Sequence, residues 1–212
     1  MTKKYSFHIA GPANHQVKTL FEKRGYDYNT NIKEADAVVF TGGADITPFL
    51  YGEKPLECTK FDAERDMLER REWQSLTYAQ VKIGICRGAQ LLNVLNGGSM
   101  WQDVKGHLGN HIVRVDWKEG PQYVTCSSTH HQMMIPGAEG NVIGWGKMAT
   151  SKESQLAKVE IANNGWEDAE IIEYWTSNTI CFQPHPEYGP PECEELFFKL
   201  VESWLPKPKA TT

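Results

Sequence analysis

The chain has 212 residues, of which 40% are hydrophobic and 23% charged, a composition that excludes wholesale disorder and is typical of a globular protein. Its formal net charge is −5, and without any basic run it lacks the electrostatic footprint of a nucleic-acid-binding protein. No segment approaches the roughly 18–20 consecutive apolar residues that span a bilayer, and no signal peptide is recognisable. We therefore expect a cytoplasmic protein with neither nucleic-acid nor membrane partners.

The length favours one domain, expected over residues 1–205, and the Pro/Lys/Thr-rich segment 206–212 is expected to be a flexible tail. The cysteines never form a C-x-x-C pair, which argues against a disulfide framework and against a thiolate zinc site. They are scattered along the whole chain: Cys58, Cys86, Cys126, Cys181 and Cys193.

The first half alternates short β-rich runs with helical segments. Strands are predicted at Tyr5–Ala10, Ala37–Thr41 and Val81–Ile85, and helices at Val17–Arg24, Asp62–Gln80 and Gly88–Leu95. Unbroken apolar strands separated by helices are typical of a parallel sheet covered on both faces.

The long charged helix at Asp62–Gln80 is expected to place its apolar residues on one side, namely Met67, Leu68, Trp73, Leu76 and Tyr78. Asp66 and Glu69 are expected to form salt bridges, and Asp66, beside Arg65, is a candidate brace for an active-site loop.

The second half has the pattern of an antiparallel addition, with turn residues between short strands. Strands are predicted at Ile112–Asp116, Tyr123–Cys126, Asn141–Gly146, Leu156–Ile161, Glu170–Tyr174 and Ile180–Gln183, and an amphipathic helix at Glu192–Trp204. The sequence therefore predicts an α/β protein whose mostly parallel sheet continues into antiparallel strands.

The most informative segment joins the strand Val81–Ile85 to the next helix through a G-x-C-x-G pattern centred on Cys86. This is the nucleophile-elbow arrangement with cysteine in place of serine. Gly84 and Gly88 meet the need for close backbone packing at such a turn. The helix N-terminus favours a thiolate, and the Arg87 N–H is aimed where an oxyanion would form. Without further context, the glycines are equally explained by tight packing around a buried cysteine.

A candidate base stands in the segment 183–187, where Pro184 and Pro186 hold His185 in an extended backbone. Glu187 then lies on the same side as His185 and can orient its imidazole, the third role of a Cys-His-acid triad. His107 and His111 are four residues apart, but the glycines around them disfavour a helix, so no metal pair is expected there.

These motifs resemble the class I glutamine amidotransferase superfamily, on the strength of Gly84–Gln90, Asn93, Gly97-Gly98 and Gln183–Glu187. Further stretches resemble its peptidase C26 branch, which contains the γ-glutamyl-γ-aminobutyrate hydrolases. They are Thr41–Pro48 with Tyr51-Gly52-Glu53, Arg65-Asp66 with Glu69, and Ser128-Thr129-His130-His131-Gln132. The branch's asparagine before the S-x-H run is here Ser127.

The resemblance implies a flavodoxin-like three-layer core and hydrolysis of a γ-glutamyl amide through a thioester. It assigns Cys86 as nucleophile, His185 as general acid and base, and Glu187 as orienting carboxylate. The matching oxyanion-hole donors are the N–H groups of Gly43 and Arg87, and the substrate-binding positions are Gln90, Ser128 and His130. The small γ-glutamyl substrate is the expected partner, and no metal or organic cofactor is expected, since a thiolate supplies the nucleophile.

Three other interpretations were weighed. An ammonia donor would use the same triad on glutamine and would need a separate synthetase partner. A catalytically silent binding protein would keep the scaffold, although such proteins usually lose the cysteine or the histidine. A cysteine variant of the α/β-hydrolases fits poorly, because that fold places its acid between the nucleophile and the histidine. The oligomeric state stays open, a homodimer included.

Overall fold

The computed structural model describes residues 5–118, 120–147, 150–160 and 166–206. Its main sheet has a parallel part and an antiparallel part. The parallel strands, in spatial order, are β2 (Asp27–Tyr28), β1 (Ser6–Ile9), β3 (Ala37–Phe40), β4 (Val81–Ile85) and β14 (Thr179–Phe182). The sheet continues antiparallel with β13 (Trp166–Tyr174), β10 (Asn141–Lys147), β7 (His111–Asp116) and β8 (Pro121–Cys126).

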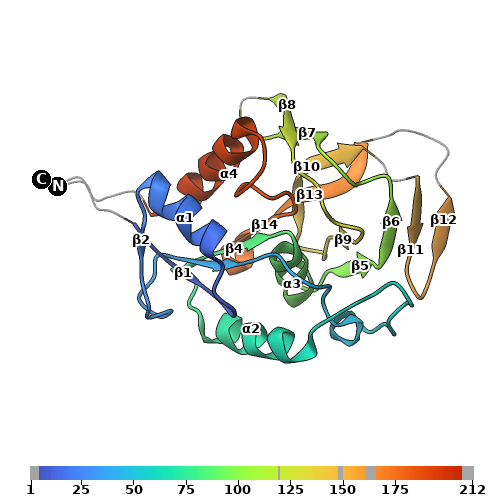
Figure 1. Cartoon of the computed structure of the whole chain (residues 1–212), viewed down its shortest axis with the longest axis horizontal. Coiled ribbons are helices and arrows are strands. Elements are labelled where there is room, and N and C mark those ends of the chain that lie inside the picture. Colours follow the sequence, from blue (N-terminus) through green and yellow to red (C-terminus); the bar gives the residue numbers. More distant parts are fainter. Residues whose placement is uncertain (1–4, 119, 148–149, 161–165, 207–212) are drawn as a thin grey trace, which may run out of the picture.

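In the described part of the chain, four α-helices cover the parallel part of the sheet, two on each face (Figure 1). They are α1 (His15–Arg24), α2 (Ala63–Ser75), α3 (Arg87–Leu95) and α4 (Pro191–Trp204), and short 3₁₀ turns stand at Pro48–Tyr51 and Trp175–Ser177. One hydrophobic core joins α1 and α4 to the sheet through residues such as Phe21 and Phe197. The other core packs α3 against the opposite face through Leu91 and Leu92. This arrangement confirms the expected α/β fold with a flavodoxin-like three-layer core.

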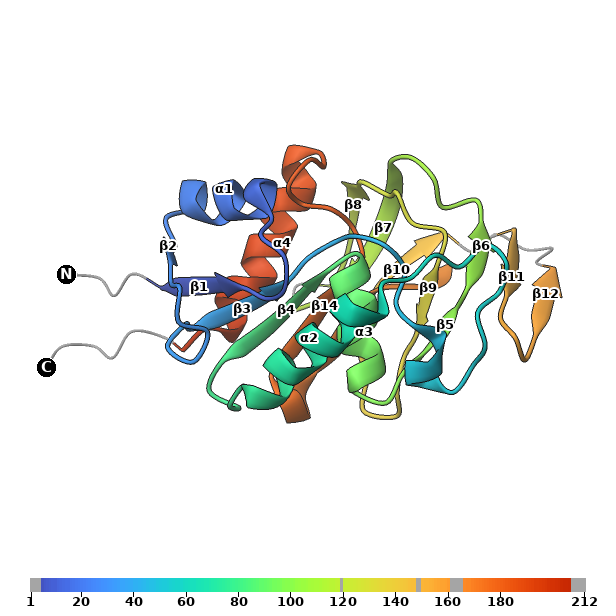
Figure 2. The same ribbon diagram turned by 60° about the horizontal axis from the view of Figure 1, so that its bottom comes forward.

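A smaller sheet lies at the end of the molecule opposite α1 (Figure 2). It consists of β12 (Lys158–Glu160), β11 (Ser151–Glu153) and β6 (Asp103–Lys105). Between it and the core lie β5 (Ser99–Trp101) and β9 (Met133–Ile135), which pair with each other. The sequence analysis did not predict β2, β5, β6, β9 or β11, because strands this short carry too few residues for a clear alternation pattern.

The helix boundaries have local causes. The Asn14 side chain accepts a hydrogen bond from the Val17 N–H, and the Asp62 side chain accepts one from the Arg65 N–H, both at 3.0 Å, so each caps a helix N-terminus. Gly25 ends α1 with a left-handed backbone, φ 100°. The predicted helices over Val17–Arg24, Gly88–Leu95 and Glu192–Trp204 are confirmed to within two residues.

The expectation for the long charged helix is wrong in two respects. It ends at Ser75 rather than Gln80, and its fully buried side chains are Asp66 and Glu69. Met67 and Leu68 are 45% and 47% exposed. Trp73 and Leu76 do pack against the core. The rest of the predicted apolar side does not, because Asp66 and Glu69 face inward to meet Arg87.

Two predicted segments extend beyond the described residues. Ile161, the last residue of the predicted strand Leu156–Ile161, lies outside the described residues, as do residues 207–212 of the expected tail. Among the described helices, none combines the length and the apolar character needed to cross a membrane.

Candidate active site

Cys86 occupies the turn between β4 and α3, as the G-x-C-x-G pattern predicts. Its backbone has φ 52° and ψ −112°, a conformation that is uncommon and costly for any residue but glycine. Two backbone hydrogen bonds hold it: the Cys86 N–H donates to Phe182 O at 3.0 Å, and Cys86 O accepts from the Gln90 N–H at 3.1 Å. The side chain is 7% exposed. A strained turn thus fixes the thiol at the start of α3, the place where a helix dipole favours negative charge.

The two flanking glycines are required by packing against backbone atoms. A Cβ on Gly84 would lie 2.5 Å from Ala89 Cα, and a Cβ on Gly88 would lie 2.1 Å from Phe40 O. Neither backbone segment can move away, since one belongs to α3 and the other ends β3. The glycines therefore allow the tight approach of helix and sheet that creates the elbow.

His185 lies directly beyond β14, whose last residue is Phe182. Its Nδ1 is 2.8 Å from Glu187 Oε1, so the predicted pair forms. The Ser127 hydroxyl fixes the backbone of His185 from both sides, accepting from its N–H at 3.0 Å and donating to its C=O at 2.8 Å. Tyr188 stacks on the imidazole with ring centroids 4.5 Å apart. Both the backbone and the ring of this histidine are therefore restrained.

The histidine and the cysteine meet beside Gly42. A Cβ on Gly42 would lie 2.9 Å from His185 Cε1 and 3.8 Å from Cys86 Cβ. Burial lowers the pKa of His185, but its hydrogen bonds with Cys86 and Glu187 outweigh burial and raise the pKa to about 10. An imidazole held between a thiol and a carboxylate can take a proton from the one while the other stabilises its charge.

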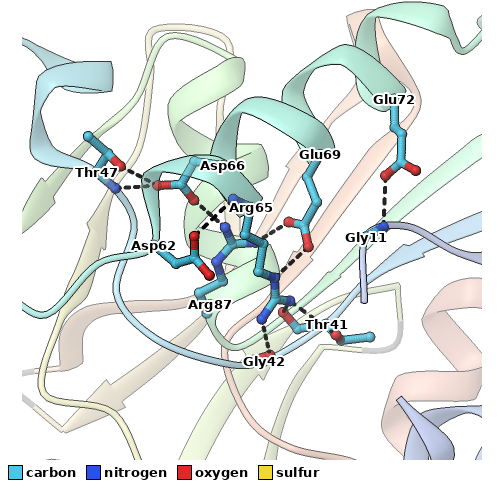
Figure 3. A network of polar contacts seen from close by, with 10 residues as sticks. All are labelled: Gly11, Thr41, Gly42, Thr47, Asp62, Arg65, Asp66, Glu69, Glu72 and Arg87. Carbon is cyan, nitrogen blue, oxygen red and sulfur yellow. Dashed lines mark hydrogen bonds and ion pairs between the residues drawn. The ribbon is translucent and has the colours of Figure 1, made fainter. Parts of the chain in front are cut away.

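The loop after β3, which carries Gly42 and Gly43, is fastened to α2 by Arg65 (Figure 3). The guanidinium donates to Gly42 O at 3.1 Å and to Thr41 O at 3.0 Å. A Cβ on Gly43 would lie 2.2 Å from Arg65 Nη1, so only glycine allows this approach. Arg65 therefore holds the start of this loop, and Asp66, the expected brace, holds its end through Thr47.

A buried ionic network connects this brace to the elbow (Figure 3). The Arg87 guanidinium bonds both Asp66 and Glu69, which confirms the salt bridges expected for these carboxylates. Glu69 also accepts from Arg65 Nε at 2.7 Å. Asp66 accepts from the Thr47 N–H at 2.7 Å and from its hydroxyl at 2.5 Å. The residue after Cys86 and the loop beside it are thus held by the same helix, α2.

The three expected substrate-binding residues are buried but have other contacts in the structure. Gln90 donates to Gln183 Oε1 at 3.2 Å. The Ser128 hydroxyl bonds the backbone carbonyl of His107. The His130 Nδ1 contacts Gln132 O at 2.9 Å. Their role toward a glutamyl group stays a prediction.

Three contributors to the site were missed from the sequence: Ser127, Tyr188 and the anchoring role of Arg65. Ser127 stands at the position where the resembling branch has asparagine, and that departure was the one available signal. The contacts of Arg65 with Thr41 and Gly42 depend on how distant segments pack, which no local pattern reveals. Tyr188 is only three residues from His185, but the sequence does not indicate that their rings stack.

Two groups among the described residues bring metal-ligand atoms together. One is partly exposed and consists of Cys58, Asp103 and His131. The other is fully buried and consists of His107, His130 and Glu170. Neither group includes Cys86, His185 or Glu187.

Comparison with known proteins gives a consistent result. The model of the family described as Peptidase C26 matches residues 2–187. A putative glutamine amidotransferase-like protein, YvdE of Lactococcus lactis, is 30% identical over 185 residues, covering 76% of this chain and 71% of its own.

Solved structures resemble this one at the level of the fold. A putative GMP synthase component from Thermoplasma acidophilum has a TM-score of 0.66 at 14% identity, covering 96% of this chain and 97% of its own. PurLQS of Thermotoga maritima has a TM-score of 0.63 at 14% identity, covering 96% and 99%.

Proposed function

Because the chain belongs to the peptidase C26 family, we propose that it is a cysteine-dependent hydrolase that cleaves γ-glutamyl amide bonds and releases glutamate. The observation that carries this proposal is the meeting of Cys86, His185 and Glu187 beside Gly42. The cysteine sits on a strained elbow, and the histidine hydrogen-bonds Glu187 and lies beside the cysteine at Gly42. Thiol–imidazole–carboxylate arrangements of this kind serve nucleophilic acyl transfer.

In the first half of the reaction, the Cys86 thiolate attacks the γ-carbonyl carbon of the substrate. A carbon–sulfur bond forms, and the charge that develops on the carbonyl oxygen is received by the N–H groups of Gly43 and Arg87. Removing one such donor typically costs about 2.7–4 kcal/mol of transition-state stabilisation. The His185 imidazolium gives its proton to the departing amine as the carbon–nitrogen bond breaks, which leaves a γ-glutamyl thioester.

In the second half, neutral His185 takes a proton from water, and the resulting hydroxide attacks the thioester. The carbon–sulfur bond breaks, glutamate leaves, and the proton on His185 again faces the Cys86 thiolate. Glu187 keeps the imidazole in one orientation and stabilises its positive charge in both halves. Gln90, Ser128 and His130 are the residues proposed to bind the glutamyl end.

An ammonia-donating glutaminase is the second candidate, because relatives such as YvdE carry the description glutamine amidotransferase-like. The same chemistry would then act on glutamine, and ammonia would pass to a separate synthetase. Glutaminase activity that rises strongly on adding cell extract would favour this candidate. Cleavage of γ-glutamyl-amines or γ-glutamyl peptides by the chain alone favours the hydrolase.

The test is a panel of γ-glutamyl amines, γ-glutamyl peptides and free glutamine, with glutamate release as the readout. We expect turnover by the wild type and none by Cys86→Ala. Cys58→Ser is the matched control, because Cys58 is exposed and distant from the elbow in sequence, and it should retain full turnover. A Cys86→Ala protein that hydrolyses the panel at the wild-type rate would overturn the assignment.

Glu187→Gln gives the finer test of the triad. We expect kcat to fall with little change in KM, and to fall less than in His185→Ala, since the imidazole loses its orienting carboxylate but remains present. Iodoacetamide should label Cys86 faster than Cys193. Equal labelling together with an inactive wild type would favour a catalytically silent binding protein.

A further inference from the structure

Three histidines and two carboxylates from separate parts of the second half meet in a second buried cluster. His107 follows β6, His111 begins β7, His130 precedes β9, and Asp168 and Glu170 lie on β13. His107, His130 and Glu170 are at most 4% exposed. None of the proposed catalytic steps passes through His107, His111 or Glu170.

The histidines converge on one carboxylate oxygen. Glu170 Oε1 is 3.2 Å from His107 Nδ1, 3.0 Å from His111 Nε2 and 3.8 Å from His130 Nε2. Ligand atoms that lie about 2.0–2.1 Å from a tetrahedral zinc ion are about 3.3 Å from one another. The three distances bracket that value, and the ligand atoms of His107, His130 and Glu170 all lie within 4.8 Å of one another, as the ligands of one ion do.

In two of these histidines, the ring nitrogen that points away from Glu170 already has a polar contact. His107 Nε2 lies 2.6 Å from Asp168 Oδ2, and Asp168 also pairs with Lys152. His130 Nδ1 lies 2.9 Å from Gln132 O. Metal-binding histidines characteristically direct their second ring nitrogen to a carboxylate or a backbone carbonyl, which fixes the tautomer and leaves the other nitrogen for the ion.

Three buried polar atoms of this cluster make no hydrogen bond of normal geometry among the described residues, although His107 Nδ1 lies within ion-pair distance of Glu170 Oε1. They are His107 Nδ1, His130 Nε2 and Glu170 Oε2. Buried polar atoms are almost always satisfied in native proteins, and each exception calls for a bound water, ion or ligand. A cluster of unsatisfied nitrogen and oxygen ligands is what an ion of suitable size would satisfy.

We propose that this cluster binds one divalent transition-metal ion of the zinc type per chain, through His107, His130 and Glu170. His111 hydrogen-bonds the ligand Glu170. His130 then holds the ion rather than the glutamyl end of a substrate. Imidazole and carboxylate ligands in a four-coordinate arrangement suit zinc better than calcium or magnesium, which prefer oxygen ligands in larger number. The ion joins the β6–β7 connection, the segment before β9 and strand β13.

The proposal is tested on the full chain without an affinity tag, stripped with a chelator and then incubated with Zn²⁺ or Co²⁺. After desalting, elemental analysis should find one Zn²⁺ per chain. The Co²⁺ form should show the intense visible absorption of a four-coordinate site and no thiolate-to-cobalt charge-transfer band. Absence of retained metal, or a thiolate band that indicates binding at Cys58, would overturn the proposal.

Variants locate the ion. His111→Asn removes the hydrogen bond that His111 makes to the ligand Glu170 and should weaken Zn²⁺ binding by about 10–100-fold. Asp168→Asn, which removes the carboxylate behind His107, should weaken it by about 10–100-fold. His131→Asn, in the partly exposed group with Cys58, is the matched control and should still retain one ion. Unchanged binding in His111→Asn, or its loss in His131→Asn, would place the ion elsewhere. None of these readouts depends on hydrolysis, so they stand apart from the proposed reaction.

Discussion

The molecule contains two buried ionic clusters that differ in how completely their groups are satisfied. In the first half, Arg65, Arg87, Asp66 and Glu69 form a network of two cations and two anions (Figure 3). Within the described part of the chain, no buried side-chain nitrogen or oxygen of these four residues lacks a hydrogen-bond partner. In the second half, the cluster around Glu170 leaves His107, His130 and Glu170 with unpartnered atoms.

This difference separates two uses of buried charge. A network whose charges and hydrogen bonds are all paired can hold the segments that carry it in fixed positions. Removing one member would leave an uncompensated charge buried in the protein interior. A cluster with matched geometry but unmatched hydrogen bonds is incomplete as it stands, and an ion completes it. The first cluster therefore positions the elbow, while the second is the place for a ligand.

The largest expected loss of stability tests whether the charges of the first network depend on one another. Arg87→Met leaves Asp66 and Glu69 buried with fewer cationic partners, and removal of one member of a buried ion pair costs about 3–5 kcal/mol. We expect the free energy of unfolding in urea to fall by about that amount. The backbone N–H proposed for the oxyanion hole is retained in this variant.

The matched control is Arg114→Met, because Arg114 pairs with Asp116 at the surface, where the side chains are 37% and 33% exposed. Exposed pairs contribute about 0–1 kcal/mol. If Arg87→Met and Arg114→Met lost the same free energy of unfolding, the Arg87 network would not stabilise the fold more than a surface ion pair.

The next largest effect tests whether Zn²⁺ bound at the second cluster stabilises the fold. Chelation should lower the free energy of unfolding, and restoring Zn²⁺ at about 100 times its dissociation constant should return about 2.7 kcal/mol. Arg87→Met should show the same increment, since its cluster lies elsewhere, and His111→Asn should show a much smaller one. If Zn²⁺ stabilised wild type and His111→Asn equally, the second cluster would not be the metal site, and the proposed difference between the two clusters would be wrong.

A smaller loss of stability is expected when one hydrogen bond to Asp66 in the first network is removed. Thr47→Val removes the hydroxyl that bonds Asp66 and keeps the backbone N–H that bonds the same oxygen. Hydrogen bonds to charged groups contribute about 1.5–3 kcal/mol, and we expect a loss near the lower end of that range in urea unfolding. Thr19→Val, which loses an exposed contact with His15 at 3.3 Å, should cost less. A cost no greater than that of Thr19→Val would show that Asp66 does not need this bond.

The last test concerns pH, because one imidazole changes its charge. The pKa of His185 is raised from 6.5 to about 10 in the folded chain, so protonated His185 stabilises the fold fully below about pH 6.5. That stabilisation is lost as the pH rises toward about 10. The difference in unfolding free energy between wild type and His185→Ala should therefore shrink from about pH 6.5 upward, measured by urea unfolding. A difference that grows with pH would contradict the assigned contacts with Cys86 and Glu187.

The candidate active site was predictable to the extent that its signals are local. Cys86 with its flanking glycines and His185 with Glu187 each lie within five consecutive residues, and their geometry follows from a strand ending in a tight turn. The helix α2 was mispredicted because its pattern was interpreted as an apolar stripe. Asp66 and Glu69 are buried instead, and their partner Arg87 is 18 residues or more away.

The second cluster shows why local spacing is insufficient. The sequence predicts no metal pair at His107 and His111, because the glycines around them disfavour a helix. The structure brings their rings to a centroid distance of 5.2 Å through a loop and a strand instead. His130 and Glu170 join them from segments farther along the chain.

The amino-acid order alone determined the parallel α/β core, the elbow at Cys86 and the pairing of His185 with Glu187. Each rests on hydrophobic periodicity or on backbone constraints that act within a few residues. Only the tertiary structure decided which charges are buried together, because a carboxylate in a low-dielectric interior must find its cation or its metal wherever the folded chain supplies one.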